Sequence, residues 1–119
     1  MDKIVSSLEQ YTKAGEQRHA TALVTFFLEK NFKLSVSDGE EWTVINSDDK
    51  TTVIHALATT DADYLRVAQG ELIFTLFLVY GNASDGSELV ADYSVRHRHD
   101  FEEVETLLDE VYSKLYPHL

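Results

Sequence analysis

Apolar and polar residues alternate along the chain with two different periods, and each period predicts a different kind of element. In residues 1–30 the apolar side chains recur three and four positions apart, which is the spacing of one helix face. Gly15 interrupts this segment, and a glycine inside a helix costs about 1 kcal/mol relative to alanine. We therefore expect either one long helix with a weak middle or two helices joined by a bend.

The period changes to two after Phe32, which predicts a β-hairpin. Residues 34–36 and 42–44 alternate between apolar and polar side chains, and Asp38-Gly39 lies between them. An Asp-Gly pair favours a tight turn because glycine adopts positive φ freely and aspartate tolerates it.

A short helix is expected between residues 47 and 57. Ser47, Asp48 and Asp49 are good N-cap residues, and apolar residues follow with helical spacing. A strand is the alternative, because residues 51–54 are all β-branched.

Three more strands and a final helix complete the pattern. Residues 64–67 predict a short strand, and residues 72–80 form the most apolar run, with apolar side chains at both alternating sets of positions. Both faces of this central strand are therefore expected to be buried. Residues 89–95 predict the last strand. A final helix is expected to begin near Asp100, whose carboxylate can cap it, and to stop at Pro117.

This order of elements predicts one α+β domain over residues 1–119, with an antiparallel sheet of about five strands and N- and C-terminal helices packed on it. The second apolar face of the central strand also needs a cover. Terminal helices on opposite faces would provide one, and so would a homodimer.

Charge and composition narrow the function. The chain has 21 Asp and Glu residues against 10 Lys and Arg residues, a net charge of −11 that repels phosphate backbones and anionic lipids. We therefore expect no direct binding to nucleic acid or membranes. The absence of cysteine excludes disulfides and thiolate chemistry. Residues 1–9 lack the basic start of a signal peptide, which favours a cytoplasmic location.

Acidic side chains gather around the first hairpin and on the last helix. The residues expected to bind a partner are Glu40, Glu41, Asp48, Asp49, Glu102, Glu103, Glu105 and Asp109. Within the last helix only Lys114 offers a local opposite charge. This excess favours docking on a basic protein, through complementary patches or by imitation of nucleic-acid charge. The alternative is a solvated face that keeps the protein in solution.

The segment 96–100 (RHRHD) is the most conspicuous candidate for metal binding. On an extended backbone His97 and His99 project to the same side, as two metal ligands would. No third ligand is evident, and the interleaved arginines repel a cation. We therefore expect a polar junction between strand and helix, with no metal or cofactor, although an interaction site is a further alternative.

Other candidate catalytic groups also lack the required context. Asp61 and Asp63 form a pair in a polar segment, where carboxylates are usually solvated. His19 and His55 lie in helical patterns, so they are expected to be surface residues or hydrogen-bonded helix residues rather than bases. The five glycines are scattered singly, which excludes a glycine-rich phosphate loop. We therefore expect no enzymatic activity.

Four segments, DGEEW (38–42), ALATTD (56–61), VYGN (79–82) and ADYS (91–94), resemble a family of small bacterial accessory proteins, some of them carried on mobile elements. The resemblance covers roughly residues 34–95 and leaves out both terminal helices. It implies no activity and supplies no catalytic residues. It implies that Trp42, Asp61, Tyr80, Asn82, Asp92 and Tyr93 recur in the family.

Together these features predict a non-catalytic acidic protein-binding module, of the kind with which a phage- or plasmid-borne inhibitor imitates nucleic-acid charge. The alternative is a dimeric cytoplasmic chaperone for a secreted protein, which would use apolar surface instead of charge. The short helix expected before the third strand departs from that chaperone family. A third hypothesis is an enzyme or metal protein centred on His97, His99 and Asp100.

Overall fold

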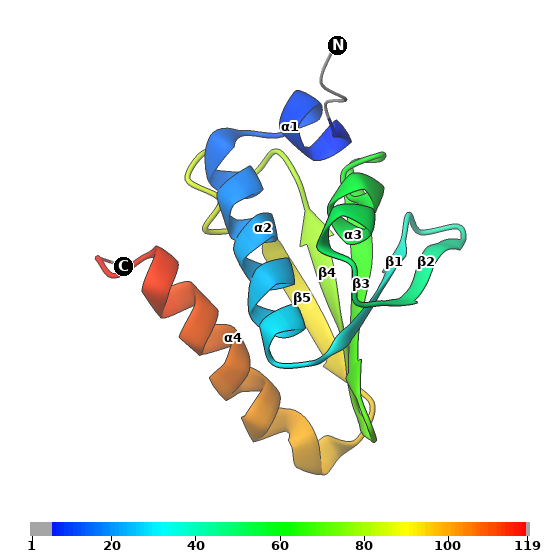
Figure 1. The fold of residues 1–119 in the computed structure, drawn as a ribbon. Coiled ribbons are helices and arrows are strands. Elements are labelled where there is room, and N and C mark those ends of the chain that lie inside the picture. Colours follow the sequence, from blue (N-terminus) through cyan, green and yellow to red (C-terminus); the bar gives the residue numbers. More distant parts are fainter. Residues whose placement is uncertain (1–5, 119) are drawn as a thin grey trace.

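A five-stranded antiparallel sheet carries the helices on one of its faces (Figure 1). The computed structural model describes residues 6–118. The elements in chain order are α1 (Ser7–Tyr11), α2 (Ala14–Glu29), β1 (Lys33–Ser37), β2 (Trp42–Ser47), α3 (Lys50–Ala56), β3 (Ala62–Gln69), β4 (Leu72–Val79), β5 (Val90–Val95), a 3-10 turn η1 (Arg98–Asp100) and α4 (Phe101–Leu115). The strand order in the sheet is β2-β1-β3-β4-β5, with every neighbouring pair antiparallel. The predicted α+β class is confirmed.

The N-terminal segment forms two helices, which was one of the two alternatives. The break falls at Thr12 and Lys13, and Gly15 lies inside the first turn of α2. Gly15 does not form the bend. It allows a close approach of another segment, because a Cβ at this position would lie 2.2 Å from the carbonyl carbon of Asp85. The loop between β4 and β5 therefore packs directly on the α2 backbone. The part of the helix prediction that covers residues 1–5 lies outside the described residues.

The predicted hairpin is confirmed, with a loop of four residues, 38–41, between β1 and β2. The carboxylate of Asp38 accepts hydrogen bonds from the backbone N–H groups of Glu40 and Glu41, at 2.9 and 3.0 Å. Gly39 has a φ of 101°, which lets the chain reverse at that point. These two bonds lower the pKa of Asp38.

The segment after the hairpin is helical, so the strand alternative for residues 51–54 is wrong. Asp49 is the N-cap of α3, and its carboxylate accepts a bond from the Thr52 N–H at 3.4 Å. Val53 is fully buried. A side-chain cap and one buried contact therefore outweigh the β-branched composition, because propensity is a weak preference that tertiary packing overrides.

The last helix begins where it was predicted but without the predicted cap. Asp100 is the residue before α4, yet its side chain makes no capping hydrogen bond. The chain enters α4 through η1 instead, in which the Asp100 N–H donates to the His97 carbonyl at 2.9 Å. Asp100 has φ −89° and ψ −2°, so its backbone is already helical and lacks the extended geometry of a capping residue. The helix ends at Leu115, before Pro117.

The core lies between the sheet and the helices. Phe27 of α2 packs edge-to-face against Phe32 and Phe74, with ring centroids 5.5 Å apart in both pairs. On the central strands β1, β3 and β4 most residues that point toward the helices are fully buried, as the 0–1% exposure of Phe74, Leu76 and Leu78 on β4 shows. Between residues 6 and 118, no helix is long and apolar enough to cross a membrane.

The opposite side of the sheet, called the outer face below, has no helix over it (Figure 1). On β4 the outward residues are Ile73, Thr75, Phe77 and Val79, and all four are half-buried. The prediction of burial on both faces of this strand is therefore confirmed for one face only. The helices do not lie on opposite faces.

Candidate functional site

The outward side of α4 carries a continuous acidic surface, called the α4 acidic face below. Its carboxylates are Glu102, Glu103, Glu105, Asp109 and Glu110, all on exposed residues. At about 100° per residue these five positions span an arc of about 160°, opposite the buried Val104 and Val111. Within residues 6–118 the ion pairs of this face lie at one end, where Lys30 and Lys114 approach Glu110 at 3.9 and 4.0 Å.

Glu105 is held in place by the sheet. The hydroxyl of Tyr93 on β5 donates to its carboxylate at 2.8 Å, and the Tyr93 ring stacks on Phe101 at 5.8 Å. Desolvation, and after it the bond to Glu105, raises the pKa of Tyr93 to about 12. Tyr93 therefore stays a neutral donor, and it fixes the N-terminal half of α4 against the edge of the sheet.

The predicted acidic residues of the hairpin region lie in two exposed loops. Glu40 and Glu41 are in the β1–β2 loop, where their backbone N–H groups bind Asp38 while their side chains stay exposed. Asp48 pairs with Lys33 at 2.8 Å, and this hydrogen bond lowers the pKa of Asp48. Asp49 caps α3. The carboxylates of Asp48 and Asp49 thus already have structural partners.

The structure separates the two predicted acidic groups. The hairpin group belongs to the β2 edge of the sheet, whereas α4 packs beside β5 at the opposite edge (Figure 1). The eight predicted residues therefore do not form one site. Of the two groups, α4 presents the denser set of carboxylates.

His97 and His99 lie on the same side of the junction, as predicted. Their rings stack, with centroids 5.5 Å apart and an interplanar angle of 10°. His99 Nε2 approaches Asp100 at 3.5 Å. No group of three or more potential ligands that could hold a metal ion occurs among residues 6–118. Residues 96–100 thus form a polar junction between β5 and α4, as the sequence predicted.

His19 is buried and hydrogen-bonded, one of the two outcomes expected from its helical pattern. Its Nδ1–H donates to the Gly86 carbonyl at 2.8 Å, and its ring packs edge-on against Tyr116 at 5.5 Å. The Tyr116 hydroxyl donates to the neighbouring Asp85 carbonyl at 2.8 Å. Burial lowers the pKa of His19. α2 and the end of α4 therefore clamp the β4–β5 loop together. His55 is exposed.

The expectation that Asp63 is a solvated carboxylate is wrong. Asp63 lies on β3, on the side of the sheet that faces the helices, and its side chain is fully buried. Its Oδ2 accepts bonds from the Tyr80 hydroxyl at 2.6 Å and from the Ala58 N–H at 2.8 Å, whereas Oδ1 has no partner among residues 6–118. Burial raises the pKa of Asp63. Asp61 is exposed.

Glu16 is a second buried carboxylate, and the sequence analysis missed it. Its two oxygens accept from the Lys13 N–H at 3.1 Å and from the Gly81 N–H at 2.6 Å. Glu16 therefore caps the start of α2 and holds Gly81, the second residue after β4. A signal was present, because Glu16 shares the helical spacing of Ala20 and Leu23, which are buried.

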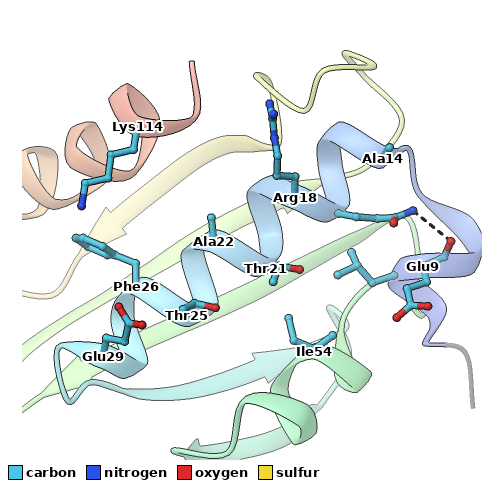
Figure 2. A pocket seen from close by; sticks show the side chains of 12 residues that line it. Glu9, Ala14, Arg18, Thr21, Ala22, Thr25, Phe26, Glu29, Ile54 and Lys114 are labelled. Carbon is cyan, nitrogen blue, oxygen red and sulfur yellow. Dashed lines mark hydrogen bonds between the residues drawn. The ribbon is translucent and has the colours of Figure 1, made fainter. Parts of the chain in front are cut away.

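A groove of about 850 Å³ with both apolar and polar lining residues runs along the outward side of α2 (Figure 2). It is lined by Leu8, Glu9, Ala14, Gln17, Arg18, Thr21, Ala22, Thr25, Phe26, Glu29, Ile54 and Lys114. Small α2 side chains such as Ala22 and Thr25 form its floor, between Ile54 of α3 and Lys114 of α4 (Figure 2). The sequence analysis did not predict this groove, because its walls come from four separate helices.

Comparisons of the chain with protein-family models, with curated proteins and with solved structures found no significant match. The fold and the surfaces define the class of protein: an α+β domain with an acidic face on α4, a groove along α2 and an uncovered sheet face.

Proposed function

We propose that the protein is a non-catalytic, cytoplasmic protein-binding module that docks the α4 acidic face on a basic protein. The observation that carries the proposal is that Glu102, Glu103 and Asp109 are exposed and form no ion pair with any residue between 6 and 118. Unpaired like charges on one helix repel one another, at a cost that a basic partner would remove.

The density of charge on α4 supports imitation of nucleic acid. Residues 102–110 rise about 12 Å along the helix axis at 1.5 Å per residue, and five carboxylates lie in that span. A nucleic-acid strand carries one negative charge per about 3.4 Å, so the two linear densities are comparable. A protein that binds nucleic acid through Lys and Arg is therefore the favoured kind of partner.

Neutralising the α4 acidic face is expected to weaken capture of the partner about tenfold or more at 0.1 M salt. The variant combines Glu102→Gln, Glu103→Gln and Asp109→Asn, which remove three charges from residues that make no ion pair in the described chain. Tagged wild type and variant are immobilised, incubated with lysate of the host cells and eluted with a salt gradient. The bound proteins are identified by mass spectrometry.

The matched control removes three exposed carboxylates elsewhere, through Glu40→Gln, Glu41→Gln and Glu71→Gln. Capture by this control is expected to match wild type. If the partner is a nucleic-acid-binding protein, short duplex DNA is expected to compete with the module for it. A complex that persists unchanged at about 1 M salt, where the Debye length is about 3 Å, would contradict the proposal.

A dimeric chaperone is the second candidate function, and the groove along α2 is the observation that favours it. Phe26 and Ile54 offer apolar contacts there, and the small side chains of Ala22 and Thr25 leave room for a segment of a client protein. Binding of this client would persist at high salt concentration. A bulky substitution in the groove, Ala22→Trp, would abolish capture of the client while leaving the α4 acidic face intact.

A further inference from the structure

The outer face is organised in rows of residues that pair across the strands. One row contains Ser35, Arg66, Thr75 and Ser94, and the adjacent row contains Ser37, Tyr64, Phe77 and Asp92. Tyr64 and Phe77 stack with ring centroids 5.0 Å apart, and Tyr64 is 41% exposed. Half of these eight residues are serine or threonine, and the large side chains among them are the stacked aromatic pair and Arg66, which are residue types enriched at protein interfaces.

The outer face lacks the excess of negative charge that the rest of the molecule carries. Asp92 is the single carboxylate among the outward residues of the five strands, whereas the chain has 21 acidic residues. The strands also place Lys33 and Arg66 there, and Arg96, just after β5, lines a hollow together with Arg66. Lys33 is already paired with Asp48 at 2.8 Å, so the remaining charges are Arg66 and Arg96 against Asp92, which is close to balance on a strongly acidic protein.

Two contacts fix the position of the Arg66 side chain on the outer face. Its guanidinium lies 4.5 Å from the centre of the Trp42 ring, and its Nη2 donates to the Ser35 hydroxyl at 3.3 Å. No carboxylate between residues 6 and 118 forms an ion pair with it. A half-buried guanidinium whose position is fixed by an aromatic ring loses little freedom on binding a carboxylate, which makes it a strong anchor.

We propose that the outer face binds the outer face of a second copy of this chain. Arg66 and Asp92 lie in adjacent rows on either side of β4. A twofold axis between two such faces, placed near β4, brings Arg66 of each copy opposite Asp92 of the other. The interface thereby contains the same ion pair twice and encloses the stacked Tyr64 and Phe77.

Electrostatics favour this face over other surfaces for self-association. Two copies with a net charge of −11 each repel one another, so they can approach only through a surface that lacks this excess. The outer face meets that condition, and the α4 acidic face does not. The interface is independent of the proposed docking function, since α4 lies on the other side of the sheet (Figure 1).

A charge-swap series tests the interface. Wild type is expected to sediment as a dimer at micromolar concentration. Arg66→Glu and Asp92→Arg, each alone, are expected to raise the dimer dissociation constant about tenfold or more, because each places two like-charge pairs in the interface. The double variant restores both pairs with reversed polarity, so it is expected to recover most of the affinity. Sedimentation equilibrium measures all four proteins.

Two controls keep the test specific. Circular dichroism and thermal unfolding show whether the single variants remain folded. The double variant lacks the Arg66–Trp42 contact just as Arg66→Glu does. If the double variant regains affinity, the loss of that contact therefore does not explain the weaker dimer of Arg66→Glu. The α4 variant that lacks three carboxylates is expected to dimerise as wild type does. A wild-type chain that stays monomeric up to about 1 mM would overturn the proposal, and so would a dimer that both single substitutions leave unchanged.

Discussion

Gly15→Ala is expected to destabilise the protein by about 1–3 kcal/mol, the range found for overpacked sites. Alanine is the better helix former by about 1 kcal/mol, and Gly15 lies in the first turn of α2. Without a close contact at this position, the substitution would therefore stabilise the protein. The added Cβ would lie 2.2–2.5 Å from the backbone atoms of Asp85, and the reciprocal contact of Gly86 with Gly15 is equally close. Backbone on both sides must move, and urea unfolding at pH 7 measures the loss.

Gly39→Ala is the matched control for this prediction. A Cβ at Gly39 meets nothing within 4 Å, although the φ of 101° strains any residue other than glycine. The control therefore measures the conformational cost alone, about 1 kcal/mol. If Gly15→Ala stabilises the protein, the packing of the β4–β5 loop on α2 is not as the structure describes it.

Local signals predicted most of the fold because they act within a few residues. The Asp38 loop and the Asp49 cap depend on hydrogen bonds that span two or three residues, so the hairpin and the helix α3 formed as the sequence indicated, although the loop has four residues and only Gly39 in it has positive φ. The role of Gly15 could not be predicted in the same way, since its contact is with Asp85, 70 positions later. The missing cap of Asp100 has a similar origin, because the preceding turn η1 fixes its backbone.

The candidate surfaces were only partly predictable. Acidic residues can be counted from the sequence, but the strand order places Glu40 and Glu102 at opposite edges of the sheet, and no local pattern contains that order. Asp63 did carry a local signal, because its two-residue spacing from Leu65 and Val67 puts it on their buried face. Its polarity hid that position, since charged residues are usually exposed.

The outer face is the part of the sheet for which the sequence predicted a cover that the helices do not provide. The apolar residues on both sides of β4 predicted two buried faces, and the helices cover only one. Of the two covers considered for the second face, helices on opposite sides are excluded by the observed packing, whereas a second copy is compatible with it. The adjacent rows that hold Arg66 and Asp92 are the basis of the pairing that we propose between two copies.

Asp63→Ala is expected to lower the free energy of unfolding by about 2–4 kcal/mol at pH 7. The substitution removes the acceptor of two buried donors, the Tyr80 hydroxyl and the Ala58 N–H, and each unsatisfied donor costs about 1–3 kcal/mol. Ala58 also has a φ of 60°, a strained conformation that its bond to Asp63 helps to hold. Asp63→Asn keeps an acceptor oxygen and removes the buried charge, so it is expected to stay close to wild type.

The difference between wild type and Asp63→Asn is expected to depend on pH. Burial raises the pKa of Asp63 above its ordinary value of 3.8, so between 3.8 and the raised pKa the folded state binds more protons than the unfolded state. The proton-linked part of the stability that Asp63 contributes is therefore fully present below pH 3.8 and is lost as the pH rises through this window, whereas its hydrogen bonds to Tyr80 and Ala58 remain. Asp48, whose pKa is lowered, acts in the opposite direction but is common to both proteins and cancels in the difference. Chemical unfolding of both proteins from pH 3 to 8 measures this difference, and a constant value would show that Asp63 titrates normally in the folded protein.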